Sequence, residues 1–252
     1  MDIKTLHLVL FSLTSLSVFS QSNEKYANVK VSYGLNIHFD KNNEIYKIYE
    51  EFSPGLVSRI EAIDSEFDFS LVFNDSTSLF YLEKKLYSDN RAVNSAIIQS
   101  GYYGRIMQQN NQYIEENLQE DFGKFLVSRS YQKWELQEET KMIGDYLCFK
   151  ATTFYTTTNP KGKVFKNEFT AWYTPQLPYK FGPAGYGNLP GLIMELQGKR
   201  ATYGVTNIQF YKDDLQSKEN EIPRLKRKKL ITEIEFEKLA AEDEKRWLER
   251  NK

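Results

Sequence analysis

The stretch VKVSYGLNIHF at residues 29–39 alternates apolar with polar or small side chains, as expected for a β-strand with one buried and one solvated face. Similar strand patterns recur at residues 67–73, 79–82, 147–155, 165–173, 192–196 and 202–211. Strands buried on both faces would instead form continuous apolar runs. The sequence therefore predicts a mainly β (α+β) fold with a curved antiparallel sheet, for which a half-barrel is one form.

Helical patterns are fewer than strand patterns. Residues 54–64 predict a short helix after a proline, and residues 112–127 are compatible with helix or strand. The clearest helix covers residues 232–250, where Thr232 and Glu235 have the spacing of a capping box. Its apolar stripe consists of Phe236, Leu239, Ala240 and Trp247. We expect this amphipathic helix to pack on its own sheet, with a partner protein as the alternative.

The first twenty residues have the pattern of a secretory signal peptide. Lys4 precedes an apolar run at residues 6–19, and Val18 and Ser20 occupy the small-residue positions before a cleavage site at Gln21. The run is shorter than the roughly 20 residues that span a bilayer. No cysteine follows it, so lipid attachment is not expected. The prediction is an exported protein, periplasmic or associated with the outer membrane.

Three segments follow from these patterns: a signal peptide at 1–20, a β-rich domain at 21–215, and a basic linker with the C-terminal helix at 216–252. The linker contains a basic run at residues 224–229. Because 33 Lys and Arg residues balance 34 Asp and Glu residues, this run is interpreted as a solvated linker rather than a phosphate-binding surface. A nucleic-acid partner is not expected.

The residue types needed for metal binding or catalysis are scarce. After signal cleavage His38 is the only histidine, and Cys148 is the only cysteine in the chain. Cys148 alternates with apolar residues in a predicted strand, where a thiol is usually inert. The glutamate pairs at 115–116 and 138–139 are interpreted as solvated charge. No catalytic residue, metal or cofactor is therefore predicted.

Prolines and glycines concentrate in one long loop. Pro175, Pro178, Pro183 and Pro190 are interleaved with Gly182, Gly185, Gly187 and Gly191. Proline restricts φ and glycine permits positive φ, so together they specify a shaped loop. The candidate contact residues in and beside it are Trp172, Tyr173, Tyr179, Phe181, Tyr186, Leu189, Pro190, Gly191, Leu192 and Ile193. They either close the end of the sheet or contact a ligand or partner.

The loop and its flanks resemble the GLPGLI family of exported proteins from the Bacteroidetes. The resemblance lies in TAWYTPQLPYKFGP at 170–183 and GNLPGLIMEL at 187–196, with KWELQEETKMIGDYLCFKATT at 133–153 upstream. Asn188 replaces the first glycine of the family motif, and asparagine tolerates positive φ better than most residues. Ala184 and Gly185 lengthen the loop.

This resemblance implies a β-rich periplasmic protein with no established activity, from a family that often accompanies outer-membrane transport or secretion machinery. The leading hypothesis is thus a non-enzymatic binding module, or an adaptor for an outer-membrane transporter or secretion component that docks through residues 172–193. The alternatives are a carrier of a lipid-like apolar ligand and a carboxylate-dependent hydrolase.

Overall fold

The computed structural model describes residues 27–42, 44–63, 66–109, 112–117, 123–158, 164–212, 218 and 220–250. The predicted signal peptide at 1–20 and the predicted turn at 159–162 lie outside these residues. Among the helices within them, none has the length and apolar character needed to cross a membrane.

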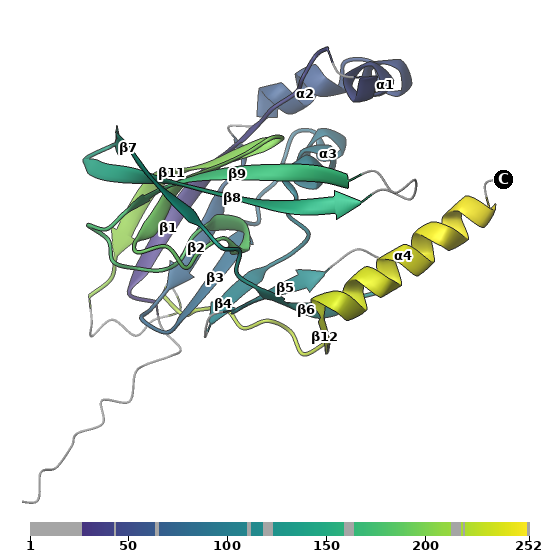
Figure 1. Ribbon diagram of the computed structural model, residues 1–252. Helices are drawn as coiled ribbons and strands as arrows, with labels where there is room; N and C mark the ends of the chain where they lie inside the picture. Colours follow the sequence, from purple (N-terminus) through teal and green to yellow (C-terminus); the bar gives the residue numbers. More distant parts are fainter. Residues whose placement is uncertain are drawn as a thin grey trace, which may run out of the picture.

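The described residues form one open sheet of twelve strands in the order β12-β6-β5-β4-β3-β2-β1-β11-β10-β9-β8-β7 (Figure 1). The strands are β1 (Val29–Ile37), β2 (Phe69–Phe73), β3 (Thr77–Leu82), β4 (Ile106–Gln109), β5 (Gln112–Asn117), β6 (Phe125–Ser130), β7 (Glu135–Ile143), β8 (Tyr146–Thr158), β9 (Val164–Thr174), β10 (Leu192–Gly198), β11 (Ala201–Phe210) and β12 (Lys229–Thr232). Every pairing is antiparallel except that of β12 with β6. The predicted mainly β fold with an antiparallel sheet is confirmed.

The helices gather at two places. Figure 1 shows α1 (Glu44–Phe52), α2 (Leu56–Ile63) and α3 (Asn90–Ser100) at one end of the sheet, while α4 (Glu233–Arg250) projects past β12. α2 coincides with the predicted helix. In the ambiguous stretch 112–127, residues 112–117 form β5 and residues 125–127 begin β6. The sequence patterns did not indicate α1 or α3.

The predicted capping box at the start of α4 is confirmed. The backbone N–H of Thr232 donates to Glu235 Oε2 at 2.7 Å, and the backbone N–H of Glu235 donates to Thr232 Oγ1 at 3.3 Å. These reciprocal bonds satisfy two donors that a helix start otherwise leaves unpaired.

The larger core lies on one face of the sheet, which we call the inner face, and a small cluster of Ala27, Val72, Leu79 and Ile222 is buried on the other face. The inner face carries alternate side chains of the central strands, among them Tyr33 of β1, Phe69 of β2 and Phe80 of β3, all fully buried. The rings of Phe69 and Phe80 stack with centroids 5.2 Å apart. Burial of several large rings supplies the hydrophobic stabilisation that a chain with one cysteine cannot obtain from an internal disulfide.

The segment before α4 is tied to the same sheet. The carbonyl of Asn220 accepts from the backbone N–H of Ala27 at 2.6 Å, and β12 extends the sheet beside β6. Within the basic run, Lys228 is mostly buried and its Nζ lies 2.8 Å from Glu116 Oε1. The interpretation of this run as solvated is therefore wrong at Lys228, because an ion pair with a buried carboxylate holds its side chain against the sheet.

Candidate functional site

The long loop at residues 175–190 packs against part of the inner face. Leu177, Phe181 and Leu189 are buried there. The ring of Phe73 lies 4.8 Å from that of Tyr179 and 5.3 Å from that of Phe181, measured between centroids. The loop thus fills one half of the inner face with its own apolar side chains, and we call this the filled half.

A buried glutamine fastens the loop to the sheet. Gln108 of β4 is completely buried. Its Oε1 accepts from the Ser78 hydroxyl at 3.1 Å and from the Gly182 backbone N–H at 3.4 Å, while its Nε2 donates to the Tyr186 carbonyl at 3.0 Å. Trp134 Nε1 donates to the Gly187 carbonyl at 2.8 Å. These bonds satisfy buried polar groups of the loop and specify its path.

The loop backbone explains why the motif is rich in glycine. A Cβ on Gly191 would lie 2.2 Å from the carbonyl oxygen of Thr174, a distance that no side chain tolerates. Asn188 has φ of 63°, so the expectation that asparagine preserves the turn is confirmed. Ala184, in the residue pair that lengthens the loop, has φ of 53°.

Most of the predicted contact residues belong to the core. Tyr173, Phe181, Leu189, Gly191, Leu192 and Ile193 are buried, Trp172, Tyr179 and Tyr186 are partly buried, and Pro190 is exposed. The loop side chains cover the inner face of the chain's own sheet rather than its end. A binding role for these residues stays a prediction, and Tyr186 is the member that also lines a cavity.

Trp172 lies on the outer face of the sheet, opposite the core. Lys141 Nζ lies 4.5 Å from the centroid of the Trp172 ring and 2.8 Å from Glu195 Oε1. The indole Nε1 is buried and has no hydrogen-bond partner among the described residues. Packing beneath a lysine, rather than free exposure, is therefore the environment of this tryptophan.

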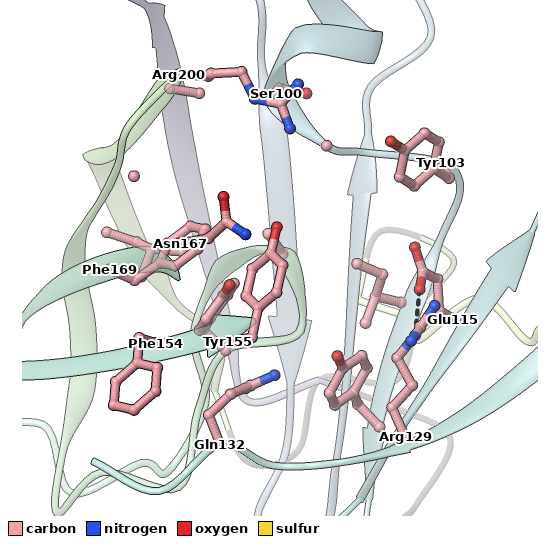
Figure 2. Close-up of a pocket in the computed structure, with 18 of the residues that line it drawn as sticks. Ser100, Tyr103, Glu115, Arg129, Gln132, Phe154, Tyr155, Asn167, Phe169 and Arg200 are labelled. Atoms are coloured by element: carbon pink, nitrogen blue, oxygen red, sulfur yellow. Dashed lines mark hydrogen bonds and ion pairs between the residues drawn. The ribbon is translucent and has the colours of Figure 1, made fainter. Parts of the chain in front are cut away.

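Beside the filled half, the inner face opens into a cavity of about 810 Å³. Figure 2 shows Phe154, Tyr155, Asn167 and Phe169 of β8 and β9 on one side, and Tyr103, Glu115 and Arg129 on the other. Ser100 and Arg200 lie at a third side, and the first turns of α4 complete the lining through Glu233, Phe236, Glu237 and Ala240. We call this region the open half.

One wall of the cavity is a row of aromatic rings. The rings of Tyr155 and Phe169 stack with centroids 5.8 Å apart and an interplanar angle of 24°. Phe169 in turn lies 4.7 Å from Tyr186, at 31°. Tyr155 is 38 % exposed at the outer end of this row. Tyr155, at the end of the row, therefore leaves part of its side chain accessible in the cavity.

The opposite wall carries a guanidinium held between two carboxylates. Arg129 of β6 donates through Nε to Glu115 Oε2 at 2.8 Å and through Nη1 to Glu233 Oε1 at 2.7 Å. Its guanidinium carbon lies 5.3 Å from the centroid of the Phe236 ring. Burial raises the pKa of Glu115, although Arg129 opposes that shift. Arg129 thus joins α4 to the cavity wall.

Glu115 and Glu116 are adjacent but face opposite sides of β5. Glu116 faces away from the cavity, where its side chain is 4 % exposed and lies 2.8 Å from both Arg105 Nε and Lys228 Nζ. Burial disfavours its ionisation, but the hydrogen bonds from Arg105 and Lys228 prevail and lower the pKa of Glu116 to about 2. The interpretation of this pair as solvated charge is wrong, because strand alternation places each carboxylate against its own basic partner.

Cys148 and His38 occupy ordinary structural positions. The Cys148 thiol is buried, and burial raises its pKa to about 11, so it is protonated at neutral pH. A ring nitrogen of His38 lies 2.8 Å from Thr202 Oγ1. Within the described part of the chain, no cluster of three or more His, Cys, Asp or Glu side chains is arranged to hold a metal ion.

Sequence reasoning did not single out Tyr103, Tyr155, Arg129 or Glu233. Tyr155 is distant in the sequence from Glu115, and their strands stand near opposite edges of the sheet, so the two walls face each other only because the sheet curves. A local signal did exist in β5, where Tyr113, Glu115 and Asn117 alternate on the side that lines the cavity. Alternation of polar residues on a predicted inner face marks a position where a core is interrupted.

The comparisons with known proteins define a segment rather than a function. No curated protein is similar enough to count as a match. Two solved structures described as PNGF-II, in space groups C2 and P21, align at 14 % and 13 % identity over 85 % and 86 % of this chain, with TM-scores of 0.47 and 0.48. The chain spans about a third of each, at 33 % and 34 %. Residues 162–195 match a family described as "Protein of unknown function (Porph_ging)", and this segment contains the TAWYTPQLPYKFGP residues and most of GNLPGLIMEL.

Proposed function

We propose that this protein is a non-enzymatic binding module and that its ligand occupies the cavity of the open half. The observation that carries the proposal is the cavity itself. Its volume of about 810 Å³ falls within the roughly 300–1,000 Å³ typical of sites for small ligands. Such sites combine apolar and aromatic surface with a few placed polar groups. The ring row of Tyr155 and the ion pairs of Arg129 supply both.

The site is also built to keep its shape without a ligand. The loop that bounds it is fastened by Gln108 and Trp134. Arg129 is fixed by carboxylates from β5 and α4. A preorganised site loses less conformational entropy on binding, so its contacts contribute more to affinity.

The same lining argues against two alternatives. A lipid-like chain would pass Glu115, Arg129 and Glu233 and desolvate their charges without a compensating contact. A carboxylate-dependent hydrolase needs two carboxyl groups with separate roles as acid and base or nucleophile. Among the four glutamates of the lining, Glu115 and Glu233 bind the same guanidinium and Glu168 forms an ion pair with Lys166, which gives three of them a structural role.

The proposed place of action is outside the cytoplasm, and the support for it is the signal-peptide pattern of residues 1–20. The resemblance of the loop to the GLPGLI family supports a further proposal, that the partner is an outer-membrane transporter or secretion component. The ligand-binding proposal stands on the cavity alone and does not require either.

Two neighbouring alanines of α4 provide a matched test. Ala240 lines the cavity, whereas Ala241 is exposed outside it. We expect the protein purified gently from its own cells to carry a bound mass of a few hundred daltons in native mass spectrometry. Ala240→Trp should project an indole ring into the cavity and lower the fraction of protein that carries this mass, while Ala241→Trp should leave that fraction unchanged.

Circular dichroism checks that both variants are folded. A bare wild-type protein, or a bound fraction that Ala240→Trp does not lower, would contradict binding in the open half.

A further inference from the structure

Three tyrosines present hydroxyl groups to the cavity. Tyr103, Tyr155 and Tyr186 line it, and their hydroxyls form no hydrogen bond to another described residue. Tyr103 lies across the cavity from Tyr155 (Figure 2), so the hydroxyl-bearing residues border one space from two sides. Burial raises the pKa of Tyr103 and of Tyr186. These two phenols are therefore neutral, and each offers one donor and one acceptor.

The partly exposed ring of Tyr155 adds an apolar face to the cavity. Tyr155 ends the row that continues through Phe169 and Tyr186. A ligand that uses this face must have a flat, weakly polar side. The same ligand must satisfy the hydroxyls just described with polar groups at its edge.

The charges of the lining nearly cancel. Four acidic residues (Glu115, Glu168, Glu233 and Glu237) accompany three basic ones (Lys199, Arg200 and Arg129). The local field therefore gives little preference to a strongly anionic or cationic ligand.

We infer that the open half binds a neutral saccharide, with one sugar face on the Tyr155 ring and its hydroxyls bonded to the phenols of Tyr103 and Tyr186. A sugar ring combines a flat C–H face with a rim of hydroxyls, which matches the platform and the neutral donors and acceptors. This inference rests on the proposed binding function and names its ligand class.

The test uses the full chain and a set of neutral trisaccharides: maltotriose, cellotriose, mannotriose and chitotriose. Isothermal titration calorimetry measures affinity, and saturation-transfer NMR identifies the contacting sugar protons. At least one trisaccharide should bind. Tyr155→Ala should weaken that binding about tenfold through loss of the ring contact. Tyr186→Phe, which removes only a hydroxyl, should weaken it by about fivefold.

Phe210→Ala serves as the control, because Phe210 is 55 % exposed on β11 and does not line the cavity. Its affinity should equal that of the wild type. Absence of binding by all four trisaccharides at about 10 mM would overturn the saccharide inference. Binding in the same assay of only trigalacturonate, an acidic saccharide, or only myristate, a fatty acid, would also overturn it.

The two proposals fail separately. A bound fraction that Ala240→Trp lowers, combined with no saccharide binding, leaves the binding module standing with another ligand class. If the purified protein carries no bound mass and no trisaccharide binds, the proposed binding function is wrong as well.

Discussion

The filled and open halves of the inner face belong to one sheet but are completed differently. On β2 and β3 the inner face carries Phe73 and Phe80, and the loop covers it with apolar side chains. On β5 and β6 it carries Glu115 and Arg129, and a cavity remains. Burial of unsolvated charge is costly, so a polar inner face does not attract an apolar cover. The side chains of the strands therefore decide which half becomes core and which becomes site.

The largest expected effect is on the stability of the filled half. Gly191→Ala places a Cβ against the Thr174 carbonyl oxygen at 2.2 Å, so the loop must shift away from the sheet. We expect a loss of more than about 3 kcal/mol in the free energy of unfolding. Gly204→Ala is the control, since its Cβ meets nothing within 4 Å. Equal melting temperatures for the two variants would show that the loop does not depend on this close approach.

The second prediction compares the two halves directly. Ile193 is completely buried beneath the loop, and Ile193→Ala should lower the free energy of unfolding by about 2–5 kcal/mol. Tyr155→Ala in the open half should lower it by less than about 1 kcal/mol, because the ring is already partly solvated. Urea titrations of both variants measure the difference. Similar losses would mean that the open half is a structural core as well.

The third prediction concerns the outer side of the open half, where Glu116 anchors β5. Its pKa of about 2 lies below the ordinary 4.5, so the folded state binds this proton more weakly than the unfolded chain. The stabilisation is full above about pH 4.5 and is lost as the pH falls toward about 2. Its expected size is about 2 kcal/mol, less than the whole shift implies, because Arg105 borders solvent.

Glu116→Gln should therefore lower the free energy of unfolding at pH 7 and flatten its decline between pH 4.5 and 2. Urea titrations across this range provide the measurement. The exposed Glu138→Gln on β7 is the control and should keep the wild-type profile. A Glu116→Gln profile that is parallel to that of the wild type would contradict the assignment of the shift.

The smallest expected effect concerns α4, whose first turns line the open half. Thr232→Ala removes the side-chain half of the capping box and should destabilise α4 by about 1 kcal/mol. Hydrogen–deuterium exchange should quicken in residues 233–240 while β1 and β2 keep their protection. Thr206→Ala, on an exposed part of β11, is the control. Hydrogen–deuterium exchange in α4 should be the same in this variant as in the wild type.

The filled half could be predicted from the sequence much better than the open half. Strand alternation and the Pro/Gly loop are local patterns, and they indicated the sheet and the positive φ of Asn188. In the open half, the capping box of α4 was a local signal of the same kind. The short strands β4 and β12 carry too few residues for a period-two pattern to be distinctive. α3 begins at Asp89, whose side chain caps it, yet its apolar stripe is weak.

The cavity could not be predicted because its walls belong to strands far apart in the sheet, which face each other only through the curvature of the sheet. Glu115 looked like one of many surface carboxylates until its pairing with Arg129 was known, and Glu233 reaches the same guanidinium from another element. The loop residues were identified correctly as a shaped segment, but sequence could not distinguish apolar side chains that cover a core from those that face a partner.

The position of β1 has a consequence for how the chain folds. β1 lies between β2 and β11, and its pairing with β11 joins Val29 to Phe210 and Ile37 to Ala201. During synthesis, one edge of β1 therefore stays without its partner until nearly the whole chain has been made. Pairings between such distant residues slow folding and leave a strand edge exposed to aggregation in the meantime. The protein is thus expected to refold slowly, in a strongly concentration-dependent yield.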